Sequence, residues 1–315
     1  MQYHYDGFRP GDPTLHTASA HAKSDCDVLI VGSGPAGLTL AAYLAQFPTI
    51  RTRLIERRDG PLVVGQADGI ACRSMEMFEV FGFAHQIMRE AYWVNETTFW
   101  KPDAHQRITR SGRIQDVEDG LSEFPHVILS QARVQDFYLE TMRKSATRLE
   151  PDYSTLVTAL DIPKDPTAPV TVTLDHHDRQ EIVTTRYVVG CDGARSTVRR
   201  SLGLELQGEA ANAARGVMDV LAVTDFHDLR LNCAIQSATE GSLLIIPREG
   251  GYMVRLYIEL DKLNPEERVA DREITVDDLI AAAGRILAPY TLDVREIAWW
   301  SVYEIGQRLT DHFTD

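Results

Sequence analysis

The sequence predicts an α/β protein with two parts, a βαβ unit built on a parallel sheet and a second lobe of mostly antiparallel strands. Two observations predict this class. A glycine-rich turn at 32–37 separates a short apolar β run from a helical segment, and a succession of β runs with glycine-bearing turns fills 213–260. At 315 residues the chain is long enough to hold both parts.

The composition is that of an acidic globular protein. Hydrophobic residues make up 44% of the chain, and 32 lysines and arginines against 46 aspartates and glutamates give a formal charge of −14. This charge disfavours a general nucleic-acid surface or an anionic-membrane surface. The four cysteines are widely spaced and form no CxxC pair, so we expect no metal site and no disulfide framework. Reduced thiols fit a cytoplasmic location.

Residues 1–24 are polar and lack the apolar core and cleavage site of a secretory signal, so we expect a disordered tail there. The window "VLIVGSGPAGLTLAAYLA" at 28–45 has about the length of a membrane span. Its glycines and proline fit a βαβ unit better, and we expect no membrane span.

The βαβ unit is the most informative motif. A β run, "DCDVLIV", stops at "GSGPAG", a helical segment follows, and a second run, "RTRLIE", ends at Glu56. Gly32, Gly34 and Gly37 fill the G-x-G-x-x-G spacing, and Glu56 lies 19 residues beyond Gly37.

Each residue of this fingerprint has a physical role. The three glycines allow a tight turn, close approach of the backbone to a pyrophosphate, and close packing of helix on strand. Pro35 and Ala36 open the helix, whose free N–H groups face the phosphate charge. Glu56 accepts hydrogen bonds from a ribose, with Arg57 beside it. The pattern predicts dinucleotide binding, although glycine-rich turns without a ligand also show it.

The stretch "GQADGIACRSMEMFEVFGF" at 65–83 places Asp68 in a turn bracketed by glycines, with Arg73 near the start of an amphipathic helix. Farther on, 107–126 has the composition of a loop. The segment "SQARVQDFYLETMRKSA" has helical periodicity with Gln131 in its first turn.

Strands are expected at 154–160, 169–175 and 181–189, and the last delivers Asp192 at its end. A carboxylate at the carboxyl edge of a sheet can contact a cofactor. An ordinary helix cap is the alternative reading of Asp192.

In the second lobe, "YMVRLYIEL" alternates with period two, so Arg255 and Tyr257 share the polar face of a strand. Arg248 lies near the preceding hairpin turn. A solvated outer face with routine charges is the alternative. A helix is expected at 275–289, followed by a strand.

Several motifs together carry a family resemblance: "DVLIVGSGPAGLTLA", "GQADGIACRSMEMF", "VVGCDGARSTVRRSLG", "GVMDV", "LLIIPREGGYMVRLYIEL" and "YEIGQR". They resemble the phenol 2-monooxygenase branch of the single-component, FAD-dependent aromatic hydroxylases, from about residue 25 to the end of the chain. The resemblance implies a glutathione-reductase-like Rossmann FAD-binding domain at 25–92 and 126–204. It also implies an inserted, mostly antiparallel β-sheet substrate lobe at 93–125 and 205–300, and the start of a truncated return to the FAD domain at 301–315.

The resemblance also implies roles for individual residues. Asp68, Arg248 and Tyr257 are implied to be catalytic, with Asp68 managing proton movement and Tyr257 bonding the phenolic oxygen. Arg255 and Tyr303 are implied to line the substrate pocket. The cofactor residues that it implies together with the fingerprint are Gly32, Gly34, Pro35, Ala36, Gly37, Glu56, Arg57, Gln66, Arg73, Gln131 and Asp192.

The implied reaction is hydroxylation of a phenolic ring. NAD(P)H reduces FAD, O2 adds to the flavin as a C4a-hydroperoxide, and its terminal oxygen attacks the ring. The partners implied are a small aromatic substrate and O2, and a homodimer is left open as the assembly.

Members of the family continue past the point that matches Asp315 with a strand and a "GD" segment that contacts FAD. Its absence leaves three expectations open: an active aromatic monooxygenase, a truncated and catalytically inactive remnant, and a tailoring hydroxylase that acts on a larger aromatic metabolite.

Overall fold

The computed structural model describes residues 3–4, 7–8, 25–64, 67–165, 167–177, 179–260 and 272–314. The chain divides into two compact units. Unit 1 comprises Met1–Pro61 and Gln135–Glu205, and unit 2 comprises Leu62–Val134 and Leu206–Asp315.

This division differs from the domain ranges expected from the sequence, since the segment with Asp68 falls in unit 2. Compactness alone does not define a functional domain, so the predicted ranges stay a prediction. The tail expected at 1–24 lies outside the described residues, apart from the paired strands β1 (Tyr3–His4) and β2 (Gly7–Phe8).

Unit 1 is built on a six-stranded sheet of order β10-β4-β3-β13-β12-β11. The first four strands in this order are parallel, and β13, β12 and β11 pair antiparallel. The strands are β3 (Cys26–Val31), β4 (Thr52–Ile55), β10 (Pro151–Asp152), β11 (Thr155–Asp161), β12 (Val170–His176) and β13 (Arg179–Gly190). The three strands predicted between 154 and 189 are confirmed.

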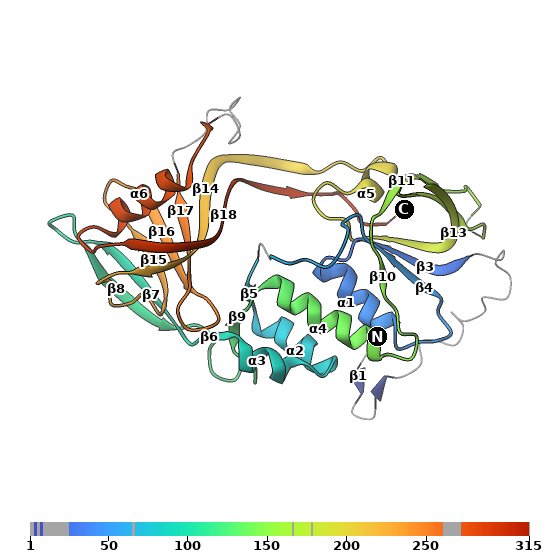
Figure 1. Cartoon of the computed structure of the whole chain (residues 1–315), viewed down its shortest axis with the longest axis horizontal. Helices are drawn as coiled ribbons and strands as arrows, with labels where there is room; N and C mark the ends of the chain where they lie inside the picture. The colour runs from blue at the N-terminus through green and yellow to red at the C-terminus, as the bar shows by residue number, and fades with distance from the viewer. Residues whose placement is uncertain are drawn as a thin grey trace. The chain divides into compact units, whose positions relative to one another are not determined.

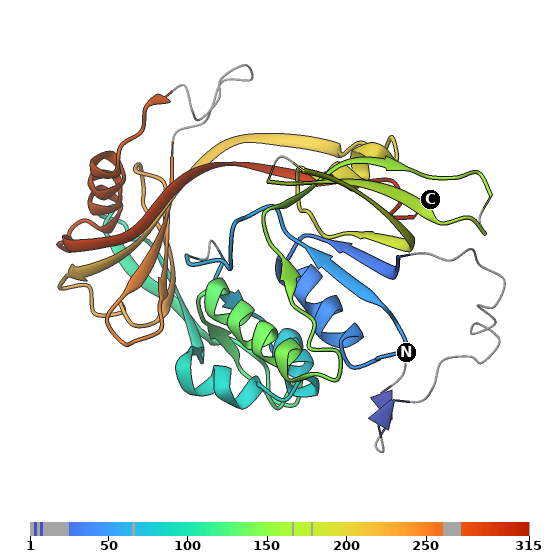
Figure 2. The ribbon, with the colours of Figure 1, turned by 45° about the vertical axis from the view of Figure 1, so that its right-hand side comes forward.

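The βαβ order is confirmed, because α1 (Pro35–Leu44) connects β3 to β4. Figure 2 shows α1 lying along these two strands. In register, Val31 pairs with both Ile55 and Gly190, so three parallel strands end at the same edge of the sheet. The residues that follow them, including Gly32, Glu56 and Asp192, therefore gather at that edge.

Two more helices belong wholly or partly to unit 1. The helix predicted from "SQARVQDFYLETMRKSA" is confirmed as α4 (Gln131–Lys144), which begins in unit 2 and buries Phe137, Tyr138 and Met142. The short α5 (Thr197–Ser201) follows β13.

Unit 2 is built on a seven-stranded sheet of order β18-β14-β17-β16-β15-β7-β8. All neighbours pair antiparallel except β15 and β7, which are parallel. The strands are β7 (Glu96–Pro102), β8 (Ile108–Gln115), β14 (Gln207–Val223), β15 (Asn232–Gln236), β16 (Ser242–Pro247), β17 (Val254–Glu259) and β18 (Asp293–Leu309). The mostly antiparallel β lobe is confirmed.

A small three-stranded sheet, of order β5-β9-β6, is also part of unit 2. It comprises β5 (Gly69–Ile70), β6 (Tyr92–Val94) and β9 (His126–Ile128), and the helices α2 (Cys72–Val80) and α3 (Ala84–Glu90) lie between β5 and β6 in the chain. This sheet matters for function because β5 begins directly after Asp68.

The two faces of the seven-stranded sheet differ. One face packs against α6 (Val276–Leu287), as Figure 1 shows, and forms a core with Met218, Leu256 and Ile258. Packing is close: a Cβ on Gly216 would lie 2.3 Å from Leu279 Cδ2. The opposite face carries Arg255 and Tyr257, because side chains alternate along β17.

The predicted loop at 107–126 is wrong in its first part, where β8 pairs with β7. The strand lies at the edge of the sheet, and most of its side chains are exposed. Its residues are therefore mainly polar, and the sequence lacks the apolar alternation that would predict a strand. No helix in the described part of the chain has the length and apolar character to cross a membrane.

Candidate active site and cofactor site

The glycine fingerprint has the geometry that dinucleotide binding requires. Gly32 has φ +102°, and a Cβ there would lie 2.5 Å from the Cys191 carbonyl oxygen. A Cβ on Gly37 would lie 1.9 Å from the Gly32 carbonyl oxygen, so only glycine lets α1 pack this closely. A Cβ on Gly34 would meet no atom within 4 Å. The space beside Gly34 is open, as approach of a pyrophosphate requires.

The start of α1 is suited to an anion. Pro35 occupies the first turn, Pro35 and Ala36 are exposed, and no side chain caps the helix. The N–H groups of the first turn therefore have no side-chain acceptor and can meet a phosphate.

Glu56 is held rigidly at the end of β4. Its carboxylate accepts hydrogen bonds from the Ser33 N–H (2.8 Å), from Ser33 Oγ (2.9 Å) and from the Arg58 side chain (3.1 Å). Burial raises the pKa of Glu56, but the hydrogen bonds from Arg58 and Ser33 outweigh it and lower the pKa to about 2. Glu56 is therefore an anion with fixed orientation, as an acceptor for a ribose should be.

Asp192 makes the helix-capping contacts weighed for it, and its contact with a cofactor stays a prediction. Its Oδ2 accepts hydrogen bonds from the N–H groups of Thr197 (2.6 Å) and Val198 (3.3 Å), so it does cap α5. Its Oδ1 is buried and has no hydrogen-bond partner among the described residues. A buried acceptor without a partner is costly, and a hydroxyl of a bound ligand would satisfy it.

A second cluster lies in unit 2, centred on Asp68, and we call Asp68, Asp219, Arg248, Glu249 and Arg255 the charge network. Arg248 Nη1 donates to Asp68 Oδ2 (3.0 Å) and to Asp219 Oδ2 (3.1 Å). Arg255 Nη1 lies 3.3 Å from Asp68 Oδ2. The relative exposure of Asp68 is 5% and that of Arg255 is 0%, so these charges interact with little screening by water.

The backbone around Asp68 is pinned. Its carbonyl oxygen accepts from the Leu129 N–H (2.9 Å), and the Ala67 carbonyl accepts from the Gln131 N–H (3.2 Å). Gln131 Oε1 also accepts from the Ala67 N–H (3.3 Å). The turn that carries Asp68 is therefore held by the start of α4.

Burial raises the pKa of Asp68, and the charges of Asp219 and Glu249 add to this, while Arg255 and Arg248 lower it. The net pKa is above the ordinary value. Tyr257 accepts a hydrogen bond from Arg255 Nη1 (3.3 Å), and burial together with the charge of Asp68 raises its pKa. Both groups thus favour their protonated forms more strongly than they would in water.

Two aromatic rings extend this polar face of the sheet. Trp299 pairs with Asp219 across β14 and β18, and the Arg255 guanidinium lies 5.3 Å from the centre of its ring. Tyr303 pairs with Arg215 and is 39% exposed. Tyr303 therefore shares the face of Tyr257 and is open at its surface.

For four of the predicted cofactor residues, the described part of the chain shows no feature that points to a cofactor. Arg73 has a side chain that is 84% exposed and pairs with Glu76 (2.6 Å). Arg57 is exposed, and Gln131 holds the turn as described above. Gln66 lies outside the described residues. Contact of these side chains with a cofactor stays a prediction.

The sequence analysis did not single out Asp219 and Glu249. Asp219 is a carboxylate inside the apolar run "VMDVLAV" of β14, and an acid in a buried strand signals a buried partner. That partner, Arg255, pairs with it in register. Glu249 is adjacent to Arg248 in sequence, which suggested only a routine turn.

A hollow of about 440 Å³ lies on the same face of the sheet as Tyr257. Leu244 is opposite Tyr257 in register and Arg215 is opposite Tyr303, and both line this hollow. Its other lining includes Phe99, Ala234 and Gln236. Apolar walls with a few polar groups are typical of small-molecule sites.

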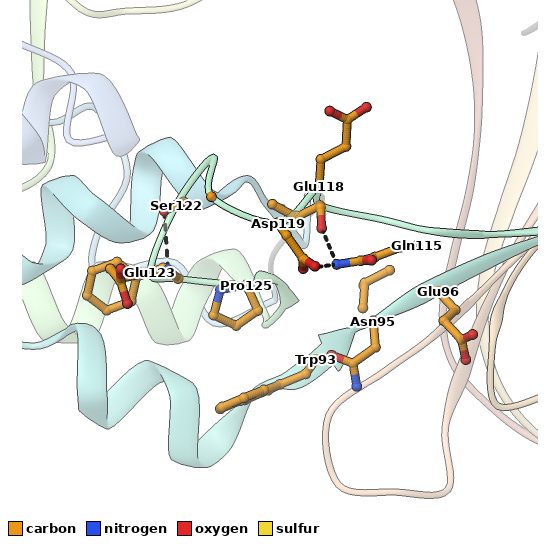
Figure 3. Close-up of a pocket in the computed structure, with 13 residues that line it drawn as sticks. Trp93, Asn95, Glu96, Gln115, Glu118, Asp119, Ser122, Glu123 and Pro125 are labelled. Carbon is orange, nitrogen blue, oxygen red and sulfur yellow. Dashed lines mark hydrogen bonds between the residues drawn. The ribbon is translucent and has the colours of Figure 1, made fainter.

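Figure 3 shows another pocket of unit 2, of about 530 Å³, which contains none of the predicted site residues. Gln115 Nε2 donates to Asp119 Oδ1 and to the Val117 carbonyl, both at 2.8 Å, and Glu96 pairs with Arg113. Because this pocket contains none of the predicted site residues, we assign it no function. Among the described residues, no group of histidine, cysteine and acidic side chains is arranged to hold a metal ion.

Comparison with known proteins identifies the family. A family model described as "FAD binding domain" matches residues 25–315. The chain belongs to this FAD-binding family. FAD is the cofactor of this family, and the open space at Gly34, the uncapped start of α1 and the buried acceptor on Asp192 are compatible with a dinucleotide of this kind.

Curated relatives agree with this assignment. The chain is 60% identical over 332 residues to 3-hydroxybenzoate 4-monooxygenase from Comamonas testosteroni, and the match covers 100% of this chain and 52% of that protein. It is 42% identical over 300 residues to the FAD-dependent monooxygenase terD from Aspergillus terreus, covering 93% of this chain and 48% of that protein. The chain thus spans about half the length of these relatives.

Solved structures share the fold. p-Nitrophenol 4-monooxygenase PnpA from Pseudomonas putida matches with a TM-score of 0.76 at 19% identity, covering 93% of this chain and 71% of that one. Aklavinone-11 hydroxylase, solved with FAD and aklavinone, matches with a TM-score of 0.72 at 23% identity, covering 93% and 56%. The fold class and the family resemblance predicted from the sequence are confirmed.

Proposed function

We propose that the protein is an FAD-dependent monooxygenase that hydroxylates a phenolic ring with NAD(P)H and O2. One observation carries the proposal: Asp68 and Tyr257, a buried carboxyl group and a phenol, both contact Arg255 within the charge network. This arrangement can accept the proton of a bound phenol and donate a hydrogen bond to its oxygen. A protein that only bound flavin would not need these groups.

The residues of unit 1 hold the cofactor in this proposal. The start of α1 and Gly34 take the pyrophosphate, Glu56 accepts from the adenosine ribose, and Asp192 accepts from a hydroxyl of FAD. FAD, when bound, supplies the exchange of electrons with NAD(P)H and the activation of O2.

The residues of unit 2 act on the substrate. Tyr257 donates a hydrogen bond to the phenolic oxygen, and Asp68 takes the phenolic proton so that the ring becomes a better nucleophile. General acid–base assistance of this type is worth about 10²- to 10⁴-fold in rate. Arg255 and Arg248 keep Asp68 in place and stabilise the negative charge that moves between it and the phenolic oxygen.

The substrate class that we propose is a hydroxybenzoate. The support is the 60% identity to 3-hydroxybenzoate 4-monooxygenase, together with the hollow on the same face of the sheet as Tyr257, whose volume of about 440 Å³ has room for one small aromatic ring. We also propose a cytoplasmic enzyme, and a homodimer as its assembly.

The test uses the 315-residue chain loaded with FAD, with and without 3-hydroxybenzoate or phenol. We expect 3-hydroxybenzoate to stimulate NAD(P)H oxidation and to yield a hydroxylated product that mass spectrometry detects. Asp68→Asn should retain FAD, seen as an unchanged visible absorption band, and lose about 10²-fold or more in coupled product formation.

Arg113→Gln is the matched control, because Arg113 lies in the same unit, pairs with Glu96 and has no contact with the charge network among the described residues. It should keep full coupled activity. A chain that binds FAD but forms no product from either compound would favour a larger aromatic substrate or an inactive protein. Unchanged product yield in Asp68→Asn would remove Asp68 from the mechanism.

A further inference from the structure

The charge network contains two arginines, Arg248 and Arg255. The Nε and Nη2 atoms of each form a pair of bonds to a carboxylate other than Asp68. We propose that Asp219 and Glu249 are positioning residues, which hold Arg255 and Arg248 so that Asp68 receives only one nitrogen from each and stays available to accept a proton. The inference rests on the proposed role of Asp68.

Asp219 takes the bidentate side of Arg255. Arg255 Nε lies 2.7 Å from Asp219 Oδ1, and Arg255 Nη2 lies 2.8 Å from Asp219 Oδ2. Asp219 on β14 and Arg255 on β17 are opposite each other in register, and both side chains are buried. Parallel paired bonds of this type fix the plane of a guanidinium as well as its distance.

Glu249 does the same for Arg248. Arg248 Nε lies 3.0 Å from Glu249 Oε2, and Arg248 Nη2 lies 2.8 Å from Glu249 Oε1. The Ser130 N–H, just before α4, donates to Glu249 Oε1 (3.2 Å) and fixes this carboxylate in turn. The Arg248 guanidinium is therefore held from two elements.

Asp68 receives weaker contacts from the two guanidiniums than Asp219 and Glu249 do. It receives the Nη1 atoms of Arg248 and Arg255 at 3.0 and 3.3 Å, and both contacts fall on Oδ2. Arg248 Nη1 is also shared with Asp219, and Arg255 Nη1 with Tyr257. Asp219 and Glu249 thus each make a paired contact with a guanidinium, whereas Asp68 makes one contact of 3.0 Å with Arg248 and one of 3.3 Å with Arg255.

The count of charges points the same way. Three carboxylates face two guanidiniums, and all of these groups are buried except Glu249, which is partly exposed, so the network carries one excess negative charge. Among the described residues, the charged or titratable groups around Asp68 include Arg255 and Tyr257 on β17, Asp219 on β14, and Arg248 and Glu249 after β16, with Tyr303 of β18 acting on Tyr257. A proton that enters this network binds most favourably at the carboxylate with the weakest compensation, and that carboxylate is Asp68.

The experiment follows the protonation of Asp68 directly, by infrared or carbon NMR titration of its carboxyl group in the full chain, with Asp68→Asn to assign the signal. We expect Asp219→Asn to lower the titration midpoint of Asp68 by about one pH unit or more, because a negative neighbour is lost and Arg255 is freed to bind Asp68. The readout needs no turnover, so it is independent of whether the chain hydroxylates anything.

Asp228→Asn is the matched control. Asp228 is also a buried aspartate of unit 2 that pairs with an arginine, Arg110, and it accepts from Trp100 Nε1 (3.1 Å), but it lies outside the charge network. It should leave the midpoint of Asp68 unchanged. An equal shift in both variants, or none in a folded Asp219→Asn protein, overturns the proposal.

Glu249→Gln provides a second variant in case the first does not fold. The Glu249 side chain is 20% exposed, against 7% for Asp219, so the substitution disturbs the core less. Loss of its charge should also lower the midpoint of Asp68. If Glu249→Gln leaves the titration midpoint of Asp68 unchanged, Glu249 is not a positioning residue. If, in addition, the Asp219→Asn protein does not fold, the whole proposal is overturned.

Discussion

At the scale of single residues, the protein uses carboxylates in opposite ways. Glu56 is buried among donors from Ser33 and Arg58, so it stays ionised. Asp68 is buried among both signs of charge, so its pKa is raised. The residue type is nearly the same, and the surroundings decide whether the pKa of the carboxyl group falls or rises.

A first prediction concerns Glu56 and pH. Its pKa in the folded chain is about 2, below the ordinary value of 4.5, so its contribution to stability is complete above about pH 4.5 and is lost as the pH falls towards 2. Urea unfolding should therefore show that Glu56→Gln costs more free energy of unfolding at pH 7 than at pH 3. A cost that is the same at both pH values would contradict the assigned hydrogen bonds.

At the scale of elements, the strand–turn–helix around α1 predicts that its glycines fail in different ways. Gly34→Ala should fold normally, because its Cβ meets nothing within 4 Å, but should bind FAD more weakly because the methyl group occupies the approach of the pyrophosphate. Gly37→Ala should lose about 2 kcal/mol or more of folding stability, since its Cβ would lie 1.9 Å from the Gly32 oxygen. Thermal melts without FAD measure the effect on folding, and FAD titrations measure the effect on binding. A melting temperature lowered equally in both variants would contradict this prediction.

Elements also show what the sequence could and could not predict. The βαβ unit and β17 were predictable because their glycine spacing and apolar alternation are local. β8 was not, because an edge strand in water needs few apolar residues. The bidentate pairing of Asp219 with Arg255 joins positions 36 residues apart, and only the register of β14 against β17 brings them together. Local patterns carry no information about that register.

At the scale of the whole molecule, the residues proposed for the cofactor and those proposed for the substrate lie in different units. The nucleotide fingerprint with Glu56 and Asp192 lies in unit 1, and the charge network with Tyr257 lies in unit 2. Unit 1 supplies backbone N–H groups and rigid acceptors, while unit 2 supplies charged side chains and aromatic rings. The cofactor and substrate functions can therefore be probed by separate ligands.

The last prediction is that FAD stabilises the 315-residue chain and that FMN does so much less. A ligand that binds only the folded state at 100 times its Kd adds about 2.7 kcal/mol to the free energy of unfolding. In the proposed function the fingerprint binds the pyrophosphate and the adenosine ribose, and FMN lacks both the second phosphate and the adenosine. Differential scanning fluorimetry over a series of concentrations should show a melting temperature that rises with FAD. Equal shifts with the two flavins would mean that the fingerprint contributes little to binding, and a chain that neither flavin shifts would mean that this half-length chain does not bind FAD by itself.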